Sequence, residues 1–239
     1  MTIYDPLEHS LQIPWVFQAV LLASALIVIA GLLVRRRLAA GDGGLFPDEG
    51  ITLRNMVEVM VEGLANLARE RMGPDYRKYF PLIGTMFLFI LVSNLLGLLP
   101  AVEGATSSSS VTWAWAAIAW VVYTAIGIAK HKGKYIIKFM GPSFFEKEIA
   151  GRHVHFRLLA PVFLILEVPL DLARMLTLSI RLLANMFADH TVIAVWLTLV
   201  PIGVPAIFMG LGLIVSVLQA FIFALLTMIF IGLALEEPH

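Results

Sequence analysis

One stretch of this chain, residues 158–200, constrains the fold more than any other. It is apolar with a helical period, and it is about twice as long as the ~20 residues that a helix needs to cross a bilayer. Six polar side chains along it fall within about 40° of one line on an α-helix, and we call them the polar stripe: Glu167, Asp171, Arg174, Arg181, Asn185 and Asp189. A charge inside a membrane costs about 2.5–3.5 kcal/mol on insertion scales, so the polar stripe must face protein or water. We therefore interpret residues 158–200 as the functional element.

The composition places the whole chain in a membrane. Of its 239 residues, 59% are hydrophobic and 14% are charged, whereas soluble domains have roughly 45–50% apolar and 25% charged residues. Seventeen basic residues balance seventeen acidic ones, so the net charge points neither to a nucleic-acid partner nor to an acidic ligand. The absence of cysteine excludes disulfides, thiolate metal sites and cysteine catalysis.

Apolar runs predict about five membrane-spanning helices, at residues 14–34, 79–100, 111–129, 158–200 and 206–235. Pro201, Gly203 and Pro205 break the chain before the last run, so the last two spans should form a hairpin. The amphipathic period of residues 51–72 fits either an interfacial helix or a lead-in to the next span. The predicted fold class is an all-α polytopic membrane protein.

We expect a single membrane domain over residues 1–239. Its parts are an N-terminal span with a linker, an amphipathic segment with two spans and a basic loop, and the long hairpin, at residues 1–50, 51–157 and 158–239. The apolar middle of the basic loop, residues 135–145, should lie on the membrane surface. His153 and His155 in this loop alternate as HVH, but without further ligands they predict no metal site.

The basic residues indicate the orientation. Fifteen of the seventeen lie after the first span, before the second, or between the third and fourth, and the other two are Arg174 and Arg181. Because cytoplasmic loops carry an excess of lysine and arginine, the N-terminus should lie outside and the C-terminus in the cytoplasm. The first span lacks a basic leading region and a cleavage site, so we expect it to be retained and not removed as a signal peptide.

Arg181 is the first candidate for function. A guanidinium stays protonated, so Arg181 can only act as a fixed positive charge, and such a charge lowers the pKa of a nearby carboxylic acid by roughly 1–3. The alternative is permanent pairing of Arg181 with Glu167, Asp171 or Asp189 on the same helix. Arg174 lies nearer to Asp171, so pairing within the helix satisfies Arg174 more easily than Arg181.

The other polar groups of the last two spans could form a proton path. Glu167, Asp171 and Asp189 are titratable, as is His190, which points about 140° away from the stripe and could line a separate aqueous entry. Asn185, Ser216 and Gln219 offer amides and a hydroxyl at a comparable depth. The alternative for each group is an interhelical hydrogen bond or a position at the water boundary. Nucleotide-binding and hydrolase motifs are absent, so the sequence predicts no cofactor and no catalytic residue.

Three motifs carry a family resemblance. FLFILVSNLLGLLP at residues 87–100, SIRLLANMFADH at 179–190 and LQAFIFALLTMIF at 218–230 resemble those of subunit a, the membrane stator subunit of rotary F-type ATP synthases. The resemblance covers the chain from about residue 45 onward. It implies that the last two spans form a long, strongly tilted hairpin against a ring of c subunits. Arg181 matches the essential arginine of the family, Asn185 the asparagine after it, and Gln219 the glutamine that faces it.

The resemblance also implies a mechanism and partners. A proton would enter from outside, neutralise a carboxylate of the c ring, travel round the ring, and leave to the inside where Arg181 favours the ionised form. Glu167 and His190 match positions of the two aqueous half-channels. The implied partners are the c ring, the peripheral-stalk b subunits, other ATP synthase subunits and membrane lipid, and the implied location is a bacterial plasma (inner) membrane. The chain would be a non-catalytic subunit.

Two departures from the family pattern stand out. Gly212 occupies a position where many members carry a titratable residue, which leaves His190 as the titratable group on that side. The loop before the third span reads ATSSSSV and lacks the usual proline and aspartate. Two other functions compete with the stator: an ion-coupled secondary transporter in which Arg181 binds an anionic substrate, and a membrane scaffold whose buried charges fix helix register.

Overall fold

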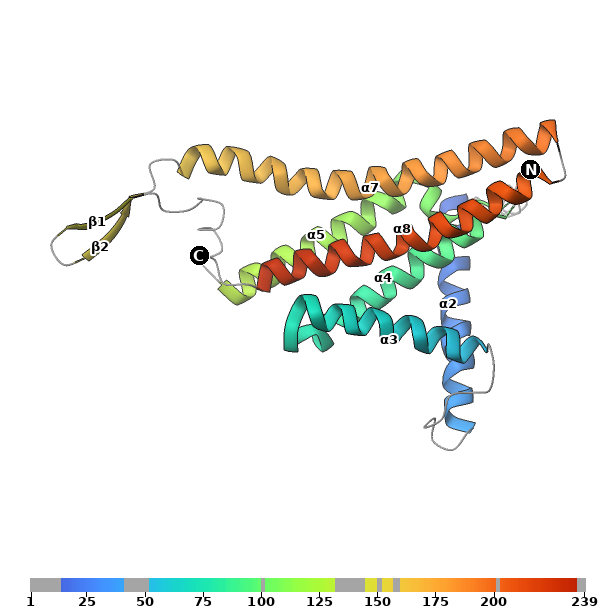
Figure 1. The fold of residues 1–239 in the computed structure, drawn as a ribbon, viewed down its shortest axis with the longest axis horizontal. Coiled ribbons are helices and arrows are strands. Elements are labelled where there is room, and N and C mark those ends of the chain that lie inside the picture. The colour runs from blue at the N-terminus through green and yellow to red at the C-terminus, as the bar shows by residue number, and fades with distance from the viewer. Residues whose placement is uncertain are drawn as a thin grey trace.

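The structure is a computed structural model that describes residues 14–40, 52–99, 102–131, 145–149, 152–156, 160–200 and 203–235 (Figure 1). The described helices are α2 (Trp15–Ala40), α3 (Leu53–Met72), α4 (Tyr76–Gly97), α5 (Ser109–His131), α7 (Ala160–Leu199) and α8 (Val204–Leu235). Two short 3₁₀ turns, η1 (Gly73–Asp75) and η2 (Ala105–Ser107), lie before α4 and before α5. A hairpin of β1 (Phe145–Ile149) and β2 (Arg152–Phe156) precedes α7.

The predicted number of membrane-spanning helices is confirmed. Within the described residues, five segments are long and apolar enough to cross a membrane: Trp15–Arg36, Arg54–Gly97, Ser109–His131, Pro169–Leu199 and Val204–Leu235. The second of these joins α3 to α4 through η1. The protein is therefore a helical multi-pass membrane protein, and each predicted span begins and ends within a few residues of an observed helix.

The segment at 51–72 is a distinct helix, α3, that packs on the bundle. Leu64, Ala68 and Met72 on one face are buried, and the hydroxyl of Thr52 caps its first turn by accepting a hydrogen bond from the Asn55 N–H at 3.3 Å. The last turn of α3 approaches α8 closely: a Cβ built on Gly232 would lie 2.6 Å from the Arg71 carbonyl oxygen. A glycine in α8 thus allows the two backbones to meet.

The segment between α5 and α7 contains a short β-hairpin, which the all-α expectation did not include. Phe145 pairs with Phe156, and Ile149 pairs with Arg152, in an antiparallel two-stranded hairpin. The sequence carries only a weak signal for this hairpin, the alternation of histidine with apolar residues in RHVHF. The predicted surface segment at 135–145 falls almost entirely on residues 132–144, which lie outside the described part of the chain.

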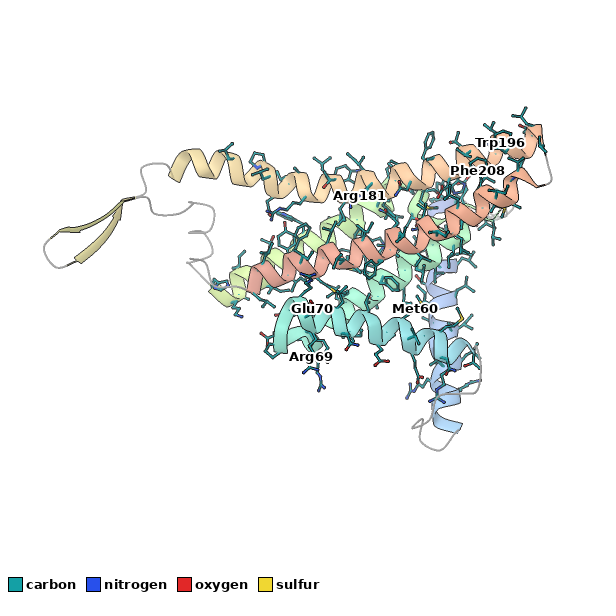
Figure 2. All side chains as sticks on the ribbon, viewed as in Figure 1. Met60, Arg69, Glu70, Arg181, Trp196 and Phe208 are labelled. Carbon is teal, nitrogen blue, oxygen red and sulfur yellow. The ribbon has the colours of Figure 1, made fainter. Side chains whose placement is uncertain are left out.

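The core of the bundle lies between α4, α5, α7 and α8. Its fully buried side chains include Ile83 and Ile90 of α4, Leu182 of α7, and Phe223 and Met228 of α8. Figure 1 shows α7 and α8 as a long antiparallel pair with α5 beside them and α4 beneath. Near the turn of this hairpin, the rings of Trp196 and Phe208 stack with their centroids 5.8 Å apart (Figure 2).

The length of α7 requires a tilt. Forty helical residues span about 60 Å, which is twice the ~30 Å hydrocarbon core. Such a helix must lie obliquely in the membrane or project from it. In Figure 1 the α7–α8 hairpin crosses the direction of α2, so the hairpin is tilted relative to that span.

Candidate functional site

Arg181 lies about midway along α7, on the surface of this chain (Figure 2). It is exposed, whereas Leu178 and Leu182 beside it are buried against the other helices. The described residues give Arg181 no hydrogen bond and no ion pair. Because an unpaired cation in a membrane span is costly, this surface of α7 needs a partner that another molecule or water supplies.

Arg174, the other arginine of the polar stripe, has partners within the chain. Its NH1 lies 3.4 Å from Oδ1 of Asp171, and its Cζ lies 5.5 Å from the centre of the Phe230 ring on α8. The other carboxylate oxygen of Asp171 accepts a hydrogen bond of 3.0 Å from the indole N–H of Trp120 on α5. The expected pairing of Arg174 with Asp171 is confirmed, and the two arginines have different surroundings.

One turn beyond Arg181, an amide pair joins the two helices of the hairpin. Asn185 Nδ2 donates a hydrogen bond of 2.8 Å to Oε1 of Gln219. Gln219 and Ser216 are both buried, and within the described part of the chain neither Gln219 Nε2 nor Ser216 Oγ has a hydrogen-bond partner. Buried polar groups of this kind pair with water or with a partner, so this part of the hairpin interface is suited to a hydrated path.

Asp189 and His190 lie further along α7, where it meets α8 and the end of α4. A Cβ built on Gly212 would lie 3.6 Å from Oδ2 of Asp189 and 2.5 Å from Cδ2 of Leu98. The small residue on α8 therefore gives room to a carboxylate from α7. Both Asp189 and His190 are half-buried, and Nε2 of His190 is buried without a hydrogen-bond partner among the described residues.

The loop at residues 102–108, which we call the η2 loop, folds back against α4. Thr106 Oγ1 donates a hydrogen bond of 2.7 Å to Oδ1 of Asn94, and both side chains are fully buried. A Cβ on Gly97 would lie 3.1 Å from Nε2 of His190 and 3.3 Å from the backbone nitrogen of Gly104. His190 thus reaches the point where α4 and the η2 loop touch.

This contact brings in a residue that the sequence analysis missed. Glu103, next to Gly104, is half-exposed, and its carboxylate acts electrostatically on His190, as does Asp189. The available signal was that Glu103 is the one charged residue of segment 101–110. Glu103, Asp189 and His190 form a cluster of titratable groups, which we call the outer cluster.

Known proteins are similar to this chain over a range that includes these residues. A family model described as "ATP synthase A chain" matches residues 17–232. The chain belongs to that family. It is 37% identical over 238 residues to ATP synthase subunit a 1 of Syntrophotalea carbinolica, a match that covers 100% of this chain and 92% of the relative. It is 37% identical over 213 residues to ATP synthase subunit a of Geobacter sulfurreducens, with 89% and 84% covered.

A less similar member of the ATP synthase A chain family also matches most of the chain. ATP synthase subunit a of Bdellovibrio bacteriovorus is 33% identical over 220 residues, and 91% of this chain and 90% of the relative are covered. The matched range contains all eight candidate residues of the last two spans, from Glu167 to Gln219. Membership of the ATP synthase A chain family agrees with the prediction of a non-catalytic membrane subunit.

The candidate residues fall into separate groups along the hairpin. Asp171 lies with Arg174, Asn185 and Ser216 with Gln219, and Asp189 with His190, while Arg181 stands at the surface between the first group and the second. The backbone of Glu167 belongs to α7, fourteen residues or about 21 Å before Arg181, and its side chain lies outside the described part of the structure. The α7–α8 hairpin therefore carries several chemically distinct positions along its length.

Proposed function

We propose that this chain is the proton-translocating stator subunit a of a rotary F-type ATP synthase, with Arg181 as the fixed charge that faces a carboxylate of the c ring. The observation that carries the proposal is that Arg181 is exposed and has no ion pair among the described residues, whereas Arg174 is paired. A carboxylate on a neighbouring rotor would compensate the charge of Arg181 and would itself be held ionised by it. The peripheral-stalk b subunits, the other ATP synthase subunits and lipid would cover the remaining surfaces.

The polar groups divide into two paths on either side of Arg181. The outer cluster, followed by Ser216, Gln219 and Asn185, would form the half-channel through which protons arrive from outside. A proton from this path would neutralise a ring carboxylate, which can then move into lipid. After a turn of the ring, the carboxyl group would return to Arg181, lose its proton to the inner path near Glu167, and pair with the arginine.

The fixed charge would also keep the two paths apart, because a proton does not pass a guanidinium easily. Each proton that moves down a potential of 100 mV releases about 2.3 kcal/mol, so several protons are needed for each ATP formed on other subunits. A direct leak between the two paths would waste this energy. Arg181 would therefore both promote release of the proton from the ring carboxyl group and act as a barrier between the two paths.

The arrangement of the basic residues supports an orientation with the N-terminus outside and the C-terminus in the cytoplasm. The ends of α3, α5 and α8 and the starts of α4 and α7 lie at one end of the bundle (Figure 1). Arg69 and Arg71 close α3, and Lys130 lies in the last turn of α5. Because lysine and arginine concentrate on the cytoplasmic side, this end would face the cytoplasm of a bacterium, across its plasma (inner) membrane.

The test compares two arginines on the same face of α7. Membrane vesicles carrying the complex with Arg181→Ala, Arg174→Ala or neither change would be assayed for ATP-driven proton pumping by dye quenching, and assembly would be checked by co-purification of the c ring. We expect Arg181→Ala to abolish pumping in an assembled complex and Arg174→Ala to retain most of it. Normal pumping by the Arg181→Ala complex would refute the proposal, and transport of a solute by the chain would favour the transporter.

A further inference from the structure

Two arginines lie on the surface that the proposed function assigns to the ring. Arg174 and Arg181 are seven residues apart, so they are separated by two helical turns, about 10 Å along the axis, and by only about 20° around it. Both are exposed on α7. A ring carboxylate that approaches this face would meet two cations if both guanidiniums were available.

Contacts around Arg174 neutralise one of these two positive charges. Asp171 is a positioned counter-ion: Oδ1 pairs with Arg174 NH1 at 3.4 Å, while Oδ2 accepts the Trp120 N–H at 3.0 Å. The Asp171 side chain is 13% exposed and the Arg174 side chain is 43% exposed. The Phe230 ring of α8 lies 5.5 Å from the guanidinium and makes a cation–π contact with it. Residues from α5, α7 and α8 thus converge on one neutral pair.

We propose that Asp171 acts as an internal counter-ion that neutralises Arg174, so that α7 presents a single effective cation, Arg181, to the ring carboxylate. This inference rests on the proposed function. It makes Asp171 a positioning residue that acts through Arg174. Both of its oxygens are engaged by donors, from Trp120 and from Arg174, and these two contacts hold the carboxylate in place beside the guanidinium.

The consequence of removing the counter-ion follows from charge alone. An uncompensated Arg174 would attract the ring carboxylate about 10 Å from Arg181, on the side of Glu167. A second cation there would hold the ionised carboxylate after it should have moved on, and rotation would slow. Asp171 thus keeps the release point of the proton at one place on α7.

The test uses Asp171→Asn, because asparagine keeps the shape of the side chain and an oxygen that can accept the Trp120 N–H, but loses the charge. We expect proton pumping in vesicles to fall several-fold while c-ring co-purification is unchanged. Adding Arg174→Gln to Asp171→Asn should restore pumping to nearly the level of the unaltered complex, and Arg174→Gln by itself should pump nearly normally. A structural role or a proton-relay role for Asp171 would not produce this rescue.

Two outcomes would overturn the inference: normal pumping by Asp171→Asn, or a double variant that pumps as poorly as Asp171→Asn. If Asp171→Asn does not assemble, Asp171→Glu decides, because it retains the charge and should pump normally; loss of pumping in an assembled Asp171→Glu complex refutes the counter-ion role. Arg181→Ala in the same series separates the two proposals. Pumping by Arg181→Ala would contradict the stator function, whereas an inactive Arg181→Ala beside a normal Asp171→Asn contradicts only the counter-ion role.

Discussion

Replacing Gly104 with alanine should detach the η2 loop from α4. A methyl group on Gly104 would run into the backbone carbonyl of Ser93 and would lie 3.2 Å from both N and Cα of Gly97. Because these backbone atoms belong to a helix, they cannot move aside cheaply, and the loop must withdraw. Overpacking of this kind costs about 1–3 kcal/mol, and loss of the hydrogen bond from Thr106 to Asn94 adds about 0.6–1.7 kcal/mol. We expect a total of about 2–5 kcal/mol.

The effect can be measured by heating the detergent-solubilised complex and recording the temperature at which half of this chain has been lost from the complex. At roughly 2–4 °C per kcal/mol for a chain of this size, Gly104→Ala should lower that temperature by about 4–20 °C. Gly63→Ala is the matched control, since Gly63 lies exposed in α3 with no atom within 4 Å of a new Cβ. Alanine there should gain about 0.5–1 kcal/mol. Equal midpoints for the two variants would refute the packing argument.

Three further predictions concern the polar groups of the outer cluster and of the hairpin. His190→Ala should slow coupled proton flux without loss of ring binding, and unchanged flux at every pH tested would remove His190 from the path. Glu103→Gln should also slow proton flux in an assembled complex, because it removes a carboxylate that acts on His190. Flux equal to that of the unaltered complex would show that Glu103 of the η2 loop has no role in proton flux. Gln219→Leu breaks the hydrogen bond from Asn185 and should cost about 0.6–1.7 kcal/mol in the heating assay, and an unshifted midpoint would contradict that bond.

The spans could be predicted from the sequence because the bilayer fixes the length of a helix and forbids unpaired backbone groups within it. The helical period likewise placed the charged residues of α7 on one face. It also favoured pairing of Arg174 over Arg181, because Asp171 lies one turn from Arg174 on the same helix. Local spacing was enough for each of these predictions.

Contacts between distant segments could not be predicted in this way. The position of Asp171 on a helical wheel does not reveal that Trp120, 51 residues earlier, donates to it. The sequence did not predict Glu103 as a site residue. Its proximity to His190 depends on a close contact between Gly97 and Gly104 where α4 ends. Such contacts arise from tertiary packing, which a period or a motif does not encode.

The central claim is that the face of α7 bearing Arg181 meets the ring carboxylate, and cross-linking tests it most directly. The chain contains no cysteine, so a single introduced one can be paired with a cysteine placed beside the ring carboxylate. Thr177 is exposed one turn before Arg181, whereas its neighbour Leu178 is 3% exposed and faces the core. Thr177→Cys should form a disulfide with the ring on mild oxidation, and Leu178→Cys should not. A cross-link from Leu178→Cys, or none from Thr177→Cys in an assembled complex, would contradict the account.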